Sequence, residues 1–161
     1  MLRMTTDLRS AIKQGKPFRS REEKATLNLV RTASLVTDAL DLLLKPHGIS
    51  PAQYNVLRIL RGAAPQGLGR NEIRRRLVAR MPDVTRLLDR LERTGLVRRE
   101  RDAADRRCVP TYLTERGRAL LDRLDDPIAE SHRRQFGHLT AEQIRTLIEL
   151  LTLVWSHGGA A

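Results

Sequence analysis

The chain has 161 residues, of which 40% are hydrophobic and 30% charged, a composition that favours one globular domain with a core of its own. Its formal net charge of +11 indicates a polyanionic partner, and its single cysteine excludes an internal disulfide and a multi-cysteine metal site. No stretch approaches the roughly 20 apolar residues of a membrane span and no signal-peptide-like run opens the chain, so we expect a cytoplasmic protein with no membrane partner.

The N-terminal part is expected to combine a basic arm with one long helix. Residues 1–21 are polar and include the breakers Gly15 and Pro17, so we expect a flexible arm with at most a short helix. Residues 22–44 keep a helical apolar period without interruption, and Gly48 lies in the segment that ends it. The apolar seam has the spacing of a helix that packs lengthwise on another, and it consists of Leu29, Ala33, Val36, Leu40 and Leu43.

Three shorter helices are predicted next. Ser50 can cap the first, Pro51 suits its first position, and Gln53 can bond back to the Ser50 amide. The second helix begins after Gly69 and buries Ile73. The expected ranges are 51–61, 70–78 and 82–93, with a loop over 62–67.

The last of these helices and the residues after it carry the most information. Val84, Leu87, Leu88 and Leu91 form one apolar stripe, while arginines occupy the other faces. Gly95 then ends the helix, and we expect two short strands over 96–101 and 108–113 around a loop over 102–107. Thirteen arginines stand against seven acidic residues between positions 70 and 107. A basic helix followed by a basic β-hairpin predicts a winged helix-turn-helix.

Two further helices are expected after the hairpin. Thr114 can cap the first, and because Pro127 removes a backbone amide we expect a kink or break near residues 125–126. Thr140 and Gln143 form a capping box for the last helix, and residues 158–161 are expected to be a disordered tail. The apolar stripe of the last helix consists of Ile144, Leu147, Ile148, Leu151, Val154 and Trp155.

The basic helix has the width of the DNA major groove, where an arginine can bind O6 and N7 of guanine through two hydrogen bonds. The alternative is a solvated face in which Asp83 pairs with Arg86 and Asp89 pairs with Arg93. The expected base-contacting residues are Arg80, Asp83, Thr85 and Arg86, and the expected phosphate-contacting residues are Ser50, Arg70, Asn71, Arg74, Arg90 and Arg93.

Four segments carry a family resemblance when they are taken in order. They are Ser-Pro-Ala-Gln-Tyr-Asn-Val-Leu at 50–57, Val-Thr-Arg-Leu-Leu-Asp-Arg-Leu-Glu-Arg-Thr-Gly-Leu-Val at 84–97, Asp-Arg-Arg at 105–107 and Leu-Thr-Glu-Arg-Gly at 113–117. With them, residues 25 to 157 resemble the multiple antibiotic resistance regulator (MarR) family of bacterial transcription factors. The residues before Val84 are larger than is usual in that family, so the base specificity is not carried over.

The resemblance implies a mainly α fold, with a winged helix-turn-helix, a small β-hairpin wing and long N- and C-terminal helices that form a dimerisation bundle. It places the DNA-binding part at about 50–113 and the dimerisation helices at about 22–45 and 114–157, within a single domain over 22–157. The expected dimerisation residues are Leu29, Ala33, Val36, Leu40, Ile144, Leu147, Leu151 and Trp155.

The resemblance also implies a role for the wing and an effector. Carried over, Arg107 enters the minor groove and Asp105 orients it, with Arg106 beside them, and the negative potential of a narrow groove favours such a contact. The alternative is a flexible basic loop that touches phosphates only. The family further implies a small phenolic (aromatic) or anionic ligand, with His47, Tyr54 and Arg58 near the expected crevice but equally consistent with ordinary helix surface.

We therefore expect a sequence-specific DNA-binding transcriptional regulator, a ligand-responsive repressor that binds a pseudo-palindromic operator as a homodimer at the nucleoid. An enzyme is not expected, because the sequence has no phosphate-binding glycine loop and its histidines lack a metal-ligand spacing; we expect no cofactor and no metal. Two alternatives stay open. One is an architectural DNA-binding protein without an effector, and the other is a metal-responsive regulator that uses His47 or His132.

Overall fold

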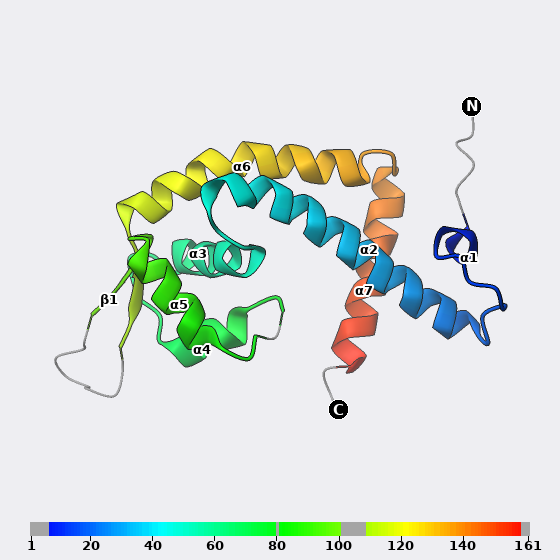
Figure 1. Cartoon of the computed structure of the whole chain (residues 1–161), viewed down its shortest axis with the longest axis horizontal. Coiled ribbons are helices and arrows are strands. Elements are labelled where there is room, and N and C mark those ends of the chain that lie inside the picture. Colours follow the sequence, from blue (N-terminus) through cyan, green and yellow to red (C-terminus); the bar gives the residue numbers. More distant parts are fainter. Residues whose placement is uncertain (1–6, 80, 101–108, 159–161) are drawn as a thin grey trace. The chain divides into compact units, whose positions relative to one another are not determined.

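The computed structural model describes residues 7–79, 81–100 and 109–158. They form two compact units, one up to Ala39 and one from Leu40 onward, and each is described by itself. Most described residues are helical, and one antiparallel hairpin completes the secondary structure (Figure 1). The elements are α1 (Leu8–Ala11), α2 (Arg21–Leu44), the 3-10 helix η1 (Lys45–His47), α3 (Pro51–Ala63), α4 (Arg70–Arg76), α5 (Val84–Arg93), β1 (Val97–Arg99), β2 (Thr111–Leu113), α6 (Glu115–Phe136) and α7 (Ala141–Gly158).

The first unit contains α1 and most of α2. The short helix α1 lies within the predicted arm, and its Leu8 is buried. The ammonium group of Lys24 in α2 lies 3.0 Å from Oδ1 of Asp7 and 5.8 Å from the centroid of the Phe18 ring. These contacts tie the described part of the arm back to the start of α2.

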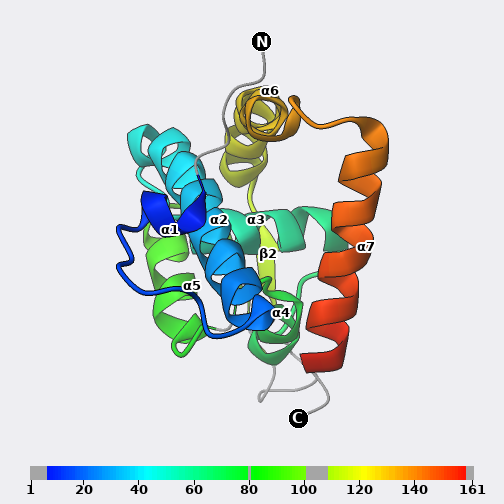
Figure 2. The same cartoon turned by 90° about the vertical axis from the view of Figure 1, so that its right-hand side faces the viewer.

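The core of the second unit lies between α3, α5, α6 and the hairpin. The side chains of Leu57, Leu88 and Leu121 are almost completely buried, as is Ile73 of the short helix α4. The helix α3 packs on α4, α5, α6 and β2, and α5 packs on β1. The helix α7 runs across α6 rather than along it (Figure 2), and none of its residues is buried.

The expected helix caps are present. The Ser50 hydroxyl accepts a bond from the Gln53 amide at 3.3 Å, and the Gln53 side chain accepts one from the Ser50 amide at 2.9 Å. Thr114 caps α6 by accepting from the Gly117 amide at 3.1 Å, and Thr140 forms a reciprocal box with Gln143. Each cap satisfies amides that have no partner inside the helix, which is why these local sequences fix the helix starts.

The hairpin is shorter than the sequence predicts. Val97 pairs with Leu113 and Arg99 with Thr111. Pro110 was predicted inside the second strand but precedes it, because proline cannot donate a hydrogen bond to the ladder. Leu68 adds an isolated bridge on the other edge of β2, with two backbone bonds to Thr111 at 3.0 and 2.9 Å. Of the expected outer parts, Glu100, Val109 and Pro110 are not in the strands, and Arg101 and Cys108 lie outside the described residues.

Of the kink or break expected near residues 125–126, the break was wrong, because α6 continues through Pro127 as one helix (Figure 1). Proline removes a single helical hydrogen bond. On either side of it, Leu124 and Ile128 are buried against the core. Two residues before the proline, the Asp125 carboxylate accepts two bonds from the guanidinium of Arg61 in α3, at 2.8 and 2.9 Å. These contacts stabilise the helical path across the proline.

Other helix boundaries moved by one or two residues. The helix α3 extends to Ala63, α4 stops at Arg76 because Leu77 is already extended, and α5 starts at Val84 with Asp83 as its N-cap. Gly158, expected in the tail, ends α7, and residues 159–161 lie outside the described residues.

Gly117 lies where the hairpin meets α6, and its replacement should destabilise the protein. A Cβ atom at this position would lie 2.3 Å from the carbonyl oxygen of Leu96, which is a backbone atom that cannot rotate away. We expect Gly117→Ala to lower the free energy of unfolding by about 1–3 kcal/mol in a urea titration. The matched change Gly62→Ala meets no atom within 4 Å in α3 and should leave stability unchanged or raise it by up to about 1 kcal/mol. Equal effects of the two changes would contradict this packing.

Candidate nucleic-acid interface

The helix α5 separates a buried face from a charged one. Val84, Leu88 and Leu91 are buried in the core, whereas the side chain of Arg86 is 89% exposed. The buried face therefore fixes the helix in the core, and the arginines between the apolar positions point outward.

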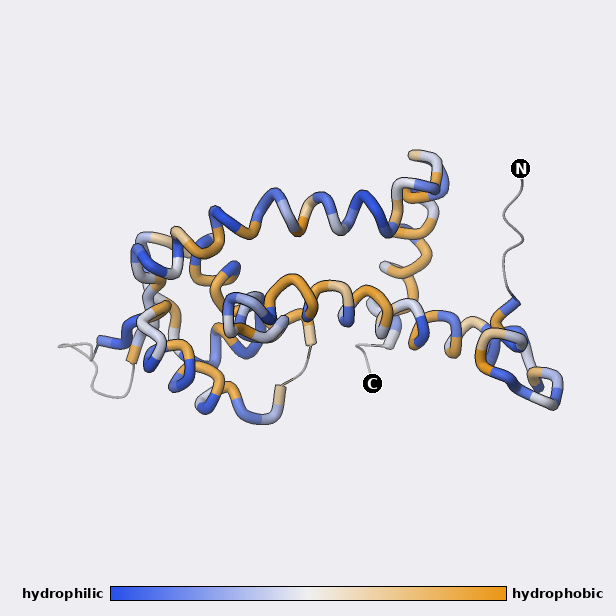
Figure 3. Tube along the Cα trace, turned by 45° about the horizontal axis from the view of Figure 1, so that its top comes forward, coloured by the Kyte–Doolittle hydropathy of each residue, from blue (hydrophilic) through white to orange (hydrophobic). Residues whose placement is uncertain are grey.

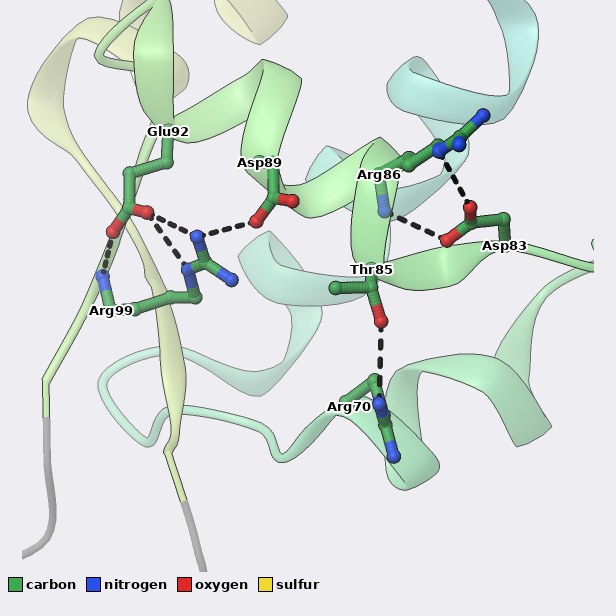
Figure 4. Close-up of polar contacts among 7 residues, drawn as sticks. All are labelled: Arg70, Asp83, Thr85, Arg86, Asp89, Glu92 and Arg99. Atoms are coloured by element: carbon green, nitrogen blue, oxygen red, sulfur yellow. Dashed lines mark hydrogen bonds and ion pairs between the residues drawn. The ribbon is translucent and has the colours of Figure 1, made fainter.

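Asp83 has a structural role at the start of α5. Its Oδ1 accepts a hydrogen bond from the Arg86 amide at 2.9 Å, which caps the helix, and its Oδ2 lies 3.1 Å from Nε of Arg86 (Figure 4). The pair between Asp83 and Arg86, expected as the alternative to a DNA contact, is thus present. It also holds the Arg86 guanidinium at the N-terminal end of the helix.

The start of α4 meets the start of α5 on one side. Nη1 of Arg70 donates to Oγ1 of Thr85 at 3.3 Å (Figure 4). A hollow of about 170 Å³ lies at this junction. It brings together five of the expected DNA-contacting residues, and its lining is Arg70, Asn71, Arg74, Pro82, Asp83, Val84 and Thr85.

The other side of α5 carries a larger hollow of about 400 Å³. Its arginines are Arg86, Arg90 and Arg93, which the sequence assigned to base and phosphate contacts. Three guanidinium groups along one open face suit the edge of a groove flanked by phosphates. The two hollows therefore place nearly all described members of the expected site around α5 and the start of α4.

Two arginines of α4 near this surface form ion pairs within the protein. The Glu72 carboxylate pairs with Arg75 and, at 2.8 Å, with Nε of Arg76, and hydrogen bonds from these two side chains, Arg75 first, hold the pKa of Glu72 below its usual value. Arg74, on the same helix, lines the hollow beside Arg70 and forms no ion pair within the described part of the chain.

The expected pair between Asp89 and Arg93 was wrong. Oδ1 of Asp89 instead lies 2.7 Å from Nη2 of Arg99 in β1, and Glu92 binds the same guanidinium (Figure 4). Sequence reasoning counted Arg99 only as one more basic residue. One signal for this contact was present in the sequence, namely two acidic residues, Asp89 and Glu92, on one helix face just before a glycine turn. The turn alone does not give the register of the returning strand, so it does not identify Arg99 as their partner.

Several expected site residues lie elsewhere. Ser50 lines neither hollow, and its hydroxyl is occupied by the α3 cap. Tyr54 is buried with Arg58 over its ring, whereas His47 lines a separate hollow beside α6. The remaining expected residues, Arg80, Asp105, Arg106 and Arg107, lie outside the described residues.

The described residues hold neither a cluster of metal ligands nor a membrane-spanning helix. No three residues of the types His, Cys, Asp and Glu come together as metal ligands in the ranges 7–79, 81–100 and 109–158. Within the same ranges, no helix combines the length and apolar content needed to cross a membrane.

Comparisons with known proteins identify this arrangement. The model of the MarR family matches residues 49–109. The HTH-type transcriptional regulator YkoM of Bacillus subtilis is 35% identical over 113 residues, which are 70% of this chain and 72% of the relative. The chain belongs to the MarR family.

Two further proteins extend the likeness over most of the chain. The homoprotocatechuate degradative operon repressor of Escherichia coli is 29% identical over 129 residues, which are 80% of this chain and 86% of the repressor. The crystal structure of a mutant MarR from E. coli complexed with operator DNA is 30% identical, with a TM-score of 0.71 over 78% of this chain and 89% of that one. The predicted mainly α, winged helix-turn-helix fold is therefore confirmed, and the chain is a DNA-binding transcriptional regulator.

Proposed function

We propose that this MarR-family protein is a homodimeric repressor that recognises a pseudo-palindromic operator in double-stranded DNA. The observation that carries the proposal is the open face of α5, where Arg86, Arg90 and Arg93 line one hollow while the opposite face is buried. The likeness to a MarR structure complexed with operator DNA supports this face as the DNA-binding surface. The proposed repressor acts in the cytoplasm at the nucleoid, and it acts as a binding protein and not as an enzyme.

The roles within the site follow from position along α5. Arg86 and Thr85 stand at the helix start, where a helix inserted in the major groove meets base edges. Arg90 and Arg93 lie further along and bind phosphates, together with Arg70 and Arg74 from α4. Asp83 fixes the direction of Arg86, and because each of its carboxylate oxygens can accept a second hydrogen bond, it also contacts a base edge. The wing places Arg107, oriented by Asp105 and flanked by Arg106, in the minor groove, and Arg80 adds a contact beside the helix start.

A second copy of the chain is the partner of the apolar helices. In α7, Trp155 is 68% and Val154 60% exposed, and α2 exposes Leu29. Both helices are rich in hydrophobic residues along their length (Figure 3). Exposed apolar stripes of this extent are typical of a protein interface. Ile144, Leu147, Leu151, Ala33, Val36 and Leu40 complete the proposed contact.

Repression is favoured over activation by the E. coli relative, whose name describes it as the repressor of a degradative operon for homoprotocatechuate. A small aromatic or anionic effector would release the operator by binding more tightly to the free dimer than to the DNA-bound form. Without such a difference in affinity, no ligand can shift the equilibrium.

The proposal is tested by presenting the purified protein with genomic DNA fragments at about 0.15 M salt, since lower salt rewards any polycation. Footprinting of the retained fragments should show a discrete protected palindrome whose half-sites are about 34 Å, or one helical turn, apart. Uniform retention of all fragments, with no protected boundary, would instead identify an architectural DNA-binding protein.

A further inference from the structure

Arg99 connects the hairpin to the helix α5. It belongs to β1, and its side chain is only 26% exposed. Nε of Arg99 donates to Oε2 of Glu92 at 2.9 Å, and Nη2 donates to Oδ1 of Asp89 at 2.7 Å (Figure 4). The guanidinium group thus joins two carboxylates on successive turns of α5.

The backbone of the hairpin is held on both edges. On the outer edge of β1, the amide of Arg99 donates to Oε1 of Glu92 at 3.1 Å. On the outer edge of β2, Thr111 exchanges two bonds with Leu68, which precedes α4. A two-stranded hairpin has little stability by itself, so these edge contacts determine where it stands relative to the helices.

The guanidinium group of Arg99 is paired with carboxylates within the protein. Hydrogen bonding to Arg99 holds the pKa of Glu92 below its usual value, and the same bonds, with Glu92 first, raise the pKa of Arg99. Its neighbour Arg98 is different, since its side chain is 50% exposed, pairs with Glu100 just after β1 and stacks on Tyr112 at 4.5 Å. Both of these contacts lie within the described part of the hairpin and do not reach α5.

We propose that Arg99, Asp89 and Glu92 form a clamp that fixes the wing against α5, so that the two DNA-binding parts meet the duplex as one preorganised unit. Arg99 is a positioning residue in this account and does not bind phosphate. The inference rests on the proposed function, because it assigns a role in operator binding. Preorganisation raises affinity by removing the cost of ordering the wing when DNA binds.

The clamp and simple electrostatics predict opposite changes in DNA affinity for Glu92→Gln. The change removes a negative charge beside a basic DNA-binding surface and frees Arg99, so charge alone predicts tighter binding to any duplex. A neutral amide cannot hold the guanidinium as a carboxylate does. The clamp therefore predicts weaker binding to the operator, by roughly three- to tenfold.

The experiment measures dissociation constants of Glu92→Gln, Arg99→Gln and the matched control Arg98→Gln for the retained palindrome and for a scrambled duplex, at one salt concentration. Glu92→Gln and Arg99→Gln should weaken operator binding, Arg99→Lys should recover part of the loss, and Arg98→Gln should have the smaller effect. If a variant binds weakly because its fold is destabilised, its thermal midpoint of unfolding should also fall. The clamp predicts weaker operator binding by Glu92→Gln without such a fall.

A double-mutant cycle separates positioning from general destabilisation. If the clamp acts through the wing, Glu92→Gln should cost little in an Arg107→Ala background and its full amount in an Arg86→Ala background. Hydrogen exchange at the Arg99 amide without DNA should speed up in Glu92→Ala, and unchanged exchange would overturn the clamp itself. Unchanged or tighter operator binding by Glu92→Gln would overturn the positioning role, whereas a wild-type chain with no preferred duplex would overturn the proposed function instead.

Discussion

Replacing Trp155 by glutamate should convert the proposed dimer to a monomer and lower operator affinity by about 10²–10⁴-fold, because each half-site then binds without the second. Trp155 is the last and largest side chain of the α7 stripe and is 68% exposed in one chain. A carboxylate there would have to be buried without a partner in the dimer, which costs several kcal/mol. Since the side chain contributes nothing to the core of one chain, the fold should survive the change.

The matched control is Ser156→Glu. It adds the same charge at the next position, which is also exposed but lies on the polar side of α7. Sedimentation equilibrium should find Ser156→Glu dimeric and Trp155→Glu monomeric, with circular dichroism spectra alike. A dimeric Trp155→Glu variant with native operator affinity would show that the apolar face of α7 is not the interface.

The second large effect is expected from Arg86→Ala. If Arg86 binds a guanine through two hydrogen bonds, its loss should cost about 1–3 kcal/mol of discrimination at one base pair of each half-site. Arg90→Ala removes the same charge two turns from the N-cap and lines the same hollow. It should instead weaken binding to all duplexes about equally and reduce the dependence of affinity on salt.

The measurement is affinity for a panel of operators with every single base-pair substitution. Arg86→Ala should flatten the preference at one position and leave the others intact, whereas Arg90→Ala should leave the whole profile unchanged in shape. Similar profiles for both variants would remove the assignment of base contact to the helix start and phosphate contact to its middle.

Features that depend on neighbouring residues were predictable from the sequence. The Ser50 and Thr140 caps, the buried face of α5 with Leu88, and the start of α4 after Gly69 were all confirmed. A cap or an apolar stripe is decided within one or two turns of helix, so the signal stands in the sequence itself.

Features that depend on distant partners were not predictable. The continuity of α6 across Pro127 depends on burial beside it and on Arg61, which is far away in the chain. The partner of Asp89 is Arg99 instead of Arg93, because the hairpin returns a guanidinium to the same helix face. Intrahelical spacing predicts which residues are able to pair, but tertiary structure decides between competing partners.

We propose that α5 and the wing of a symmetric dimer recognise a particular DNA sequence and not only its charge. The most direct test is the ratio of dissociation constants for the retained palindrome and a scrambled duplex of equal length and composition, at about 0.15 M salt. We expect the palindrome to bind at least about 10³-fold more tightly, with two chains per site. A ratio near one at that salt concentration would contradict the account.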